Sequence, residues 1–158
     1  EDLYAKVLVD KDSPYLKSIV LNKGSKDNVK IGMAIVDKSY LVGKIIEVNY
    51  TNSRALLLSD LNSKIPVLLE PMDIHAVLSG TGKNFGAIEY TKDEYKKKLT
   101  SNEIIVYTSG YGGLFKPGLP VGKIITNDLN RDNKVSFFSD FRQLDYVKII
   151  SYEIGSGN

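Results

Sequence analysis

The 158-residue sequence contains no cysteine, no tryptophan and a single histidine, His75. Without cysteine the chain can form neither a disulfide framework nor a thiolate metal site, and this absence fits an extracytoplasmic location. A lone histidine with no second His or Cys beside it argues against a metal centre, because such a site needs several ligands at suitable spacing. We therefore expect no metal and no cofactor.

A large excess of charge of one sign is also missing. Lys and Arg number 21 and Asp and Glu number 19, a net charge of +2 that is too balanced for a nucleic-acid-binding surface. No run approaches the roughly 18–20 apolar residues of a membrane-spanning helix. The chain opens at Glu1 without a Met and without a signal-peptide pattern, so we expect it to be the soluble part of a longer protein.

Three short patterns occur twice in the same order, which predicts a duplicated β unit. The first aligns Ile19, Gly24, Val29 and Gly32 with Ile105, Gly110, Phe115 and Gly118, at a constant offset of 86 residues. The second is Val42-Gly43-Lys44-Ile45-Ile46, which recurs as Val121-Gly122-Lys123-Ile124-Ile125. The third is Leu58-Ser59-Asp60-Leu61, which recurs as Phe138-Ser139-Asp140-Phe141, with Val67 and Val147 following at the same distance.

Short apolar and β-branched runs separated by Gly, Pro, Asn and Asp predict strands throughout the chain. Only residues 92–100 have a helical composition, and that stretch is too short for more than a turn or two. The sequence therefore predicts an all-β protein of two small tandem β-barrels of similar topology, with about six strands each and little helix. We assign residues 1–80 to the first barrel module, 81–153 to the second and 154–158 to a flexible tail, leaving open that strands cross over between the modules.

A glycine- and proline-rich loop between Tyr107 and Val121 predicts a backbone path that only glycine can follow. With the matching glycines of the first module it forms the expected structural motif. Its members are Gly24, Gly32, Gly43, Thr108, Ser109, Gly110, Gly118, Leu119, Pro120 and Gly122.

Ser109 invites comparison with trypsin-like proteases, which also consist of two β-barrels and carry a serine beside glycines. The chain order His75, Asp93, Ser109 matches that family, but a catalytic triad is recognised by geometry and not by order. The Gly-Asp-Ser-Gly context is absent, and the repeat aligns Ser109 with Lys23. We expect no catalytic residue, and a double-barrel serine hydrolase remains as an alternative.

Exposed apolar contacts offer a second kind of function. The chain has ten tyrosines, and aromatic side chains on loops favour protein–protein recognition. Our predicted partner-binding residues are Tyr111, Leu114 and Phe115, followed by Tyr40 and Leu41. The tyrosines also suggest an alternative, a peptidoglycan-binding module.

The motifs together resemble the extracytoplasmic part of the rod shape-determining protein MreC family, from about Leu3 to Tyr152. The most specific element is Thr108-Ser109-Gly110 followed by Pro117-Gly118-Leu119-Pro120-Val121-Gly122. The supporting motifs are Gly24-Ser25, Gly32-Met33, Leu41-Val42-Gly43-Lys44, Asp60 with Asn62-Ser63, and Ile65-Pro66-Val67. The sequence departs from the family at Asn28 and at Asn102-Glu103, where the family favours glycine and Gly-Asp.

The resemblance implies a non-enzymatic scaffold of the cell-wall elongation machinery that maintains rod shape. It implies self-association as a dimer or filament, and binding to a class B penicillin-binding protein, a monofunctional transpeptidase. It further implies work with MreD and the filament protein MreB. The location would be the periplasmic face of the bacterial inner membrane, with an anchoring transmembrane helix upstream of Glu1.

Overall fold

The computed structural model describes residues 2–8, 16–90, 103–125 and 134–152, and most of their regular structure is β-strand. The helices in this part of the chain are three short 3-10 turns, η1 (Ser25–Asp27), η2 (Tyr111–Gly113) and η3 (Phe141–Gln143). None of the helices described is long and apolar enough to cross a membrane. The predicted all-β class is confirmed, while the predicted helical turn at 92–100 and tail at 154–158 lie outside the described residues.

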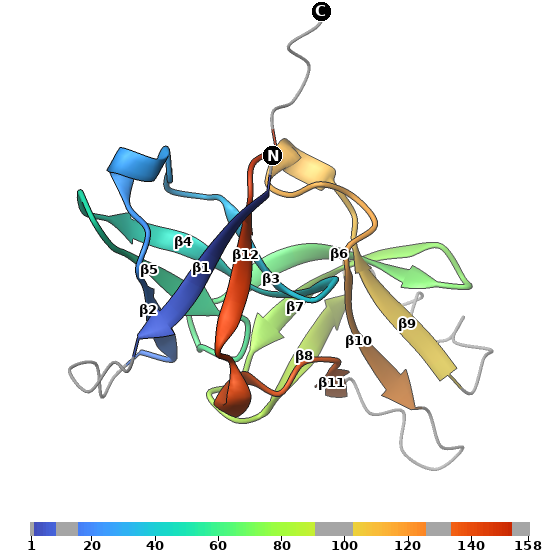
Figure 1. The fold of residues 1–158 in the computed structure, drawn as a ribbon. Coiled ribbons are helices and arrows are strands. Elements are labelled where there is room, and N and C mark those ends of the chain that lie inside the picture. The colour runs from blue at the N-terminus through green and yellow to red at the C-terminus, as the bar shows by residue number, and fades with distance from the viewer. Residues whose placement is uncertain (1, 9–15, 91–102, 126–133, 153–158) are drawn as a thin grey trace, which may run out of the picture.

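The strands form two closed antiparallel barrels of six strands each, as predicted (Figure 1). The first barrel runs β1 (Asp2–Leu8), β12 (Tyr146–Ile150), β3 (Ala34–Asp37), β4 (Tyr40–Val48), β5 (Ser53–Leu57) and β2 (Ser18–Leu21). The second runs β10 (Pro120–Ile125), β11 (Lys134–Phe137), β8 (Phe85–Tyr90), β7 (Ile74–Gly80), β6 (Lys64–Glu70) and β9 (Glu103–Thr108). Because each barrel is closed, none of these strands offers an open edge for pairing with a partner.

The chain crosses between the barrels twice. Strands β1 to β5 form most of the first barrel, the consecutive strands β6 to β11 form the whole of the second, and β12 returns to close the first. The division predicted at residue 80 is therefore not a barrel boundary, because β6 and β7 both belong to the second barrel. The crossover of strands that the sequence left open is the arrangement observed.

The pairing register is the same in both barrels, which confirms the duplicated unit. In the first barrel Gly43 of β4 lies opposite Leu57 of β5, and in the second Gly122 of β10 lies opposite Phe137 of β11. A Cβ atom on Gly43 would collide with the carbonyl oxygen of the neighbouring strand, and the same holds for Gly122. The shared glycine therefore allows two backbones to approach closely in each barrel.

The strands that follow the two crossovers, β6 and β12, also have matching pairing. Val67 of β6 lies opposite Ala76 of β7, and Val147 of β12 lies opposite Ala5 of β1. The second and third sequence patterns therefore align equivalent positions of the two barrels.

The first sequence pattern aligned the wrong strands. It matched β2 with β9, but β9 lies between β6 and β10, as β3 lies between β12 and β4. The counterpart of β9 is therefore β3, and the glycine loop after β9 does not correspond to the glycine loop after β2. The two loops share glycines and apolar residues because each makes a tight turn, not because they occupy the same place.

Strand β3 joins the two hydrophobic cores. Ile35 packs inside the first barrel with side chains such as Leu21 and Ile45. Ala34 and Val36, on the opposite face of the same strand, belong to the core of the second barrel. A strand buried on both faces explains the unbroken apolar run in this part of the sequence.

Polar contacts add to this apolar interface. Ser139 Oγ donates a hydrogen bond to Asp37 Oδ2 at 2.9 Å, linking the second crossover to β3. At the first crossover Asp60 is buried, and its Oδ2 accepts a hydrogen bond from the backbone N–H of Lys17 at 2.7 Å. Each predicted Ser-Asp turn thus lies where the chain passes from one barrel to the other.

Candidate interaction surface

Ser109 has a structural role in the loop that follows β9. Its Oγ accepts a hydrogen bond from the backbone N–H of Tyr111 at 3.1 Å, the geometry of a side-chain-stabilised turn. His75 is exposed on β7 with its ring centroid 6.3 Å from that of Tyr111, and Asp93 lies outside the described residues. No group of three or more His, Cys, Asp or Glu in the described ranges is placed to hold a metal ion.

Thr108 fixes the ends of the same loop. Its Oγ1 donates to the carbonyl oxygen of Lys116 at 2.7 Å and accepts from the backbone N–H of Leu119 at 2.9 Å. The backbone N–H of Thr108 also donates to the carbonyl of Leu119 at 2.9 Å. Thr108 is buried, so these bonds are shielded from water and hold the loop closed.

Glycines give the loop its shape. Gly110 has φ +75°, and a Cβ atom there would lie 2.9 Å from Cβ of Pro117 across the loop. Gly112 and Gly118 also have positive φ, which side chains rarely adopt. The loop is therefore a defined platform for the side chains it carries.

The predicted partner-binding residues divide into exposed and buried groups. Tyr111 is 74% exposed and Leu114 is 54% exposed, as a contact surface requires. Phe115 and Leu41 were wrongly expected at the surface: both are buried in the core that spans the barrels. Tyr40 is half-buried and its ring packs 5.1 Å from that of Phe138.

A groove of about 370 Å³ runs between the two barrels beside Leu114. It is lined by residues 30–34 of the first barrel, 113–116 of the second, and 150–152 after the returning strand β12. We call it the interbarrel groove. Ile31, 71% exposed, and Tyr152, 41% exposed, line it together with Leu114.

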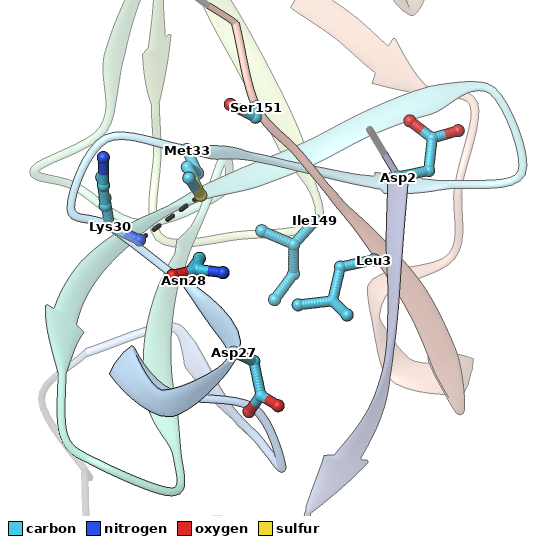
Figure 2. Close-up of a pocket in the computed structure, with 8 residues that line it drawn as sticks. All are labelled: Asp2, Leu3, Asp27, Asn28, Lys30, Met33, Ile149 and Ser151. Atoms are coloured by element: carbon cyan, nitrogen blue, oxygen red, sulfur yellow. Dashed lines mark hydrogen bonds between the residues drawn. The ribbon is translucent and has the colours of Figure 1, made fainter.

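A second hollow of about 590 Å³ adjoins the interbarrel groove at Lys30, Met33 and Ser151, which line both (Figure 2). Leu3 and Ile149 point into it from β1 and β12, as Figure 2 shows. The second hollow is lined by segments of the first barrel alone, and it shares these three residues with the interbarrel groove.

Sequence reasoning missed Ile31 and Tyr152 as surface residues. Ile31 stands between Lys30 and Gly32 in a polar loop, and an isolated apolar residue in such a loop is the signal that was available. Tyr152 gave no such signal, because it reads as the end of a strand.

A third hollow of about 480 Å³ lies at the second crossover, beside Lys17 and Phe138. There the hydrogen bond from the Arg142 side chain, with one from its backbone N–H, lowers the pKa of Asp140 below its usual range. The backbone N–H of Arg142 donates to Asp140 Oδ1 at 3.0 Å, so Asp140 caps the turn η3.

The chain matches a known protein family over most of its length. Residues 7–151 match the model of the family described as rod shape-determining protein MreC, barrel core. The cell shape-determining protein MreC of Cereibacter sphaeroides is 34% identical over 149 residues, which cover 94% of this chain and 48% of that protein. The chain thus spans about half the length of this relative.

Solved structures share the fold. MreC from Pseudomonas aeruginosa superposes with a TM-score of 0.79 at 24% identity, covering 96% of this chain and 99% of that one. A structure described as a complex between a penicillin-binding protein, PBP2, and MreC from Helicobacter pylori has a TM-score of 0.59 at 15% identity. That match covers 96% of this chain and 100% of the other.

Proposed function

The chain belongs to the MreC family of rod shape-determining proteins, and we propose that it is a scaffold that binds a class B penicillin-binding protein during cell-wall elongation. The family is one of structural proteins, not enzymes, so the serine hydrolase alternative is discarded. The proposed role is to bind partner proteins and not to catalyse a reaction.

The observation that carries the proposal is the exposed apolar set beside the interbarrel groove. Tyr111, Leu114 and Ile31 are each more than half exposed, and Thr108 anchors the loop that carries the first two. Large apolar side chains on a defined backbone favour binding, because little conformational freedom is lost when a partner covers them. Tyrosines such as Tyr111 are among the residues that supply most of the binding energy at protein interfaces.

The choice of partner is supported by the Helicobacter pylori structure, in which an MreC chain is in complex with PBP2. That likeness carries the fold alone at 15% identity, so the partner is part of our proposal for this chain. Self-association into dimers or filaments, and joint work with MreD and MreB, belong to the same proposal.

We also propose a periplasmic location with a membrane anchor upstream of Glu1. The absence of cysteine fits an oxidising compartment, and relatives such as that of Cereibacter sphaeroides are about twice as long as this chain.

Peptidoglycan binding remains a second candidate on a separate surface. On the outside of the first barrel Tyr4 of β1 lies opposite Lys148 of β12, and Lys6 lies opposite Tyr146. Both tyrosines are more than half exposed. The aromatic rings would stack on sugars and Lys6 would pair with a carboxylate, whereas Lys148 already pairs with Asp2. Co-sedimentation of the chain with purified peptidoglycan tests this candidate.

Titration calorimetry tests the main proposal. The chain is titrated with the soluble part of the class B penicillin-binding protein from the same cells, and saturable binding in the micromolar range or tighter is expected. An unrelated periplasmic protein serves as the control partner. Absence of heat and of co-elution on gel filtration would refute the proposed function.

A further inference from the structure

The interbarrel groove combines apolar side chains with a basic rim. Ile31, Leu114 and Tyr152 reach it from three segments far apart in the sequence. Convergence of exposed apolar side chains on one hollow is typical of a binding surface and not of scattered surface hydrophobics.

Two lysines line the same groove from its two sides, Lys30 from the first barrel and Lys116 from the second. Both are exposed, and no carboxylate in the described residues lies within salt-bridge distance of either. Their charges are therefore available to a partner.

The acidic groups nearby, Asp2 and Asp27, line the adjoining hollow and not the interbarrel groove itself. Asp27 Oδ2 accepts a hydrogen bond from the backbone N–H of Gly24 at 3.1 Å, and Asp2 lies 3.8 Å from Lys148 Nζ. The charge of Asp2 is thus compensated by Lys148, whereas Asp27 keeps its negative charge, because a backbone hydrogen bond does not neutralise a carboxylate. Asp27 does not line the interbarrel groove, and the charged side chains that do, Lys30 and Lys116, are positive.

Closed barrels also restrict how a partner can bind. Since none of the described strands offers an open edge, pairing by β-strand addition is not available there, and contact must be made through side chains. A groove with apolar walls and a basic rim is complementary to an apolar side chain flanked by carboxylates.

We propose that the interbarrel groove binds an acidic and apolar segment of the penicillin-binding protein. One aliphatic or aromatic side chain of the segment enters between Ile31, Leu114 and Tyr152, and neighbouring Asp or Glu carboxylates pair with Lys30 and Lys116. This assignment rests on the proposed function and adds to it the chemistry of the partner segment.

Charge reversal tests the assignment. The double variant Lys30→Glu with Lys116→Glu is titrated with the soluble penicillin-binding protein, and the affinity is expected to fall by about tenfold or more, because the rim would repel the segment. Both lysines are exposed, so the thermal unfolding midpoint should not change. Lys83→Glu, at an exposed position on another loop, is the matched control and should bind like the wild type.

Photo-cross-linking identifies the segment directly. A benzoylphenylalanine at position 31 is irradiated in the complex, and mass spectrometry of the linked peptide is expected to show an apolar residue next to Asp or Glu. A linked peptide without acidic residues, or one from a second copy of this chain, overturns the assignment. Wild-type binding that the double variant leaves unchanged also overturns it, whereas a wild type that does not bind refutes the proposed function itself.

Discussion

Adjacent residues in the loop after β9 have opposite roles. Leu114 is 54% exposed at the interbarrel groove, whereas Phe115 is 2% exposed in the core of the second barrel. Gly112 and Gly113, with φ of +71° and +69°, make the turn that leads into this pair. One side chain is therefore exposed to a partner and the next is buried in the core, although both are apolar.

Truncation of Phe115 tests this division at the level of one residue. Phe115→Ala should lower the free energy of unfolding by about 3–5 kcal/mol, because it leaves a cavity in a close-packed core. The matched variant Leu114→Ala should change it by less than about 0.5 kcal/mol, since the side chain is largely exposed. Urea denaturation followed by circular dichroism measures both. Equal losses in the two variants would contradict the structure.

The loop from Thr108 to Leu119 behaves as one element because its ends are joined. Thr108 Oγ1 donates to Lys116 and accepts from Leu119, so a single hydroxyl satisfies two backbone groups. Buried backbone groups that lose their partner are costly, which explains a threonine at this position.

Thr108→Val keeps the shape of the side chain and removes both hydrogen bonds. We expect it to lower the free energy of unfolding by about 1–3 kcal/mol, since the carbonyl of Lys116 and the N–H of Leu119 both lose a hydrogen bond to the threonine hydroxyl. Hydrogen exchange at the amide of Leu119 should become faster than in the wild type. Ser136→Ala, at an exposed hydroxyl on β11, is the control and should change neither quantity. Unaltered exchange in Thr108→Val would show that the hydroxyl does not hold the loop.

The whole molecule is held together by the return of β12 and by β3. The second barrel consists of the consecutive strands β6 to β11, but the first is not closed without β12, which follows the whole second barrel in the chain. Because β3 also contributes to both cores, β1 to β5 should not fold on their own. A scaffold benefits from this arrangement, because a partner meets both barrels in one geometry.

Engineered cysteines test the pairing of β12 with β1. No native cysteine interferes, because the chain has none. Lys6 of β1 lies opposite Tyr146 of β12, and opposite residues of antiparallel strands are within disulfide reach. The double variant Lys6→Cys with Tyr146→Cys should form an intramolecular disulfide under mild oxidation, detected by loss of free thiols. Lys6→Cys with Lys134→Cys should keep its thiols free. Free thiols in the first pair would contradict the observed topology.

Much of the fold was predictable because the information was local. The Val-Gly-Lys-Ile-Ile pattern marks β4 and β10, where a glycine permits close approach of the next strand, and the Ser-Asp patterns mark the crossovers. Alternating burial on strands such as β6 produces the apolar periodicity from which strands were predicted.

The pairing of strands was not predictable, because it depends on contacts distant in sequence. Strands β6 and β12 carry similar residues, and nothing local decides which barrel each one closes. The site was predicted only in part for the same reason. Leu114 and Phe115 are both apolar neighbours, and nothing in the local sequence indicates that Leu114 reaches the surface while Phe115 enters the core.

Cell shape is the most direct measure of the central claim, that this chain maintains rod shape by binding through the interbarrel groove. The wild-type allele is replaced by Leu114→Asp or by Leu61→Asp, which alters an equally apolar, 69% exposed leucine away from the groove. With equal protein levels, Leu114→Asp cells should round up and Leu61→Asp cells should remain rods. Rod-shaped Leu114→Asp cells would contradict the account.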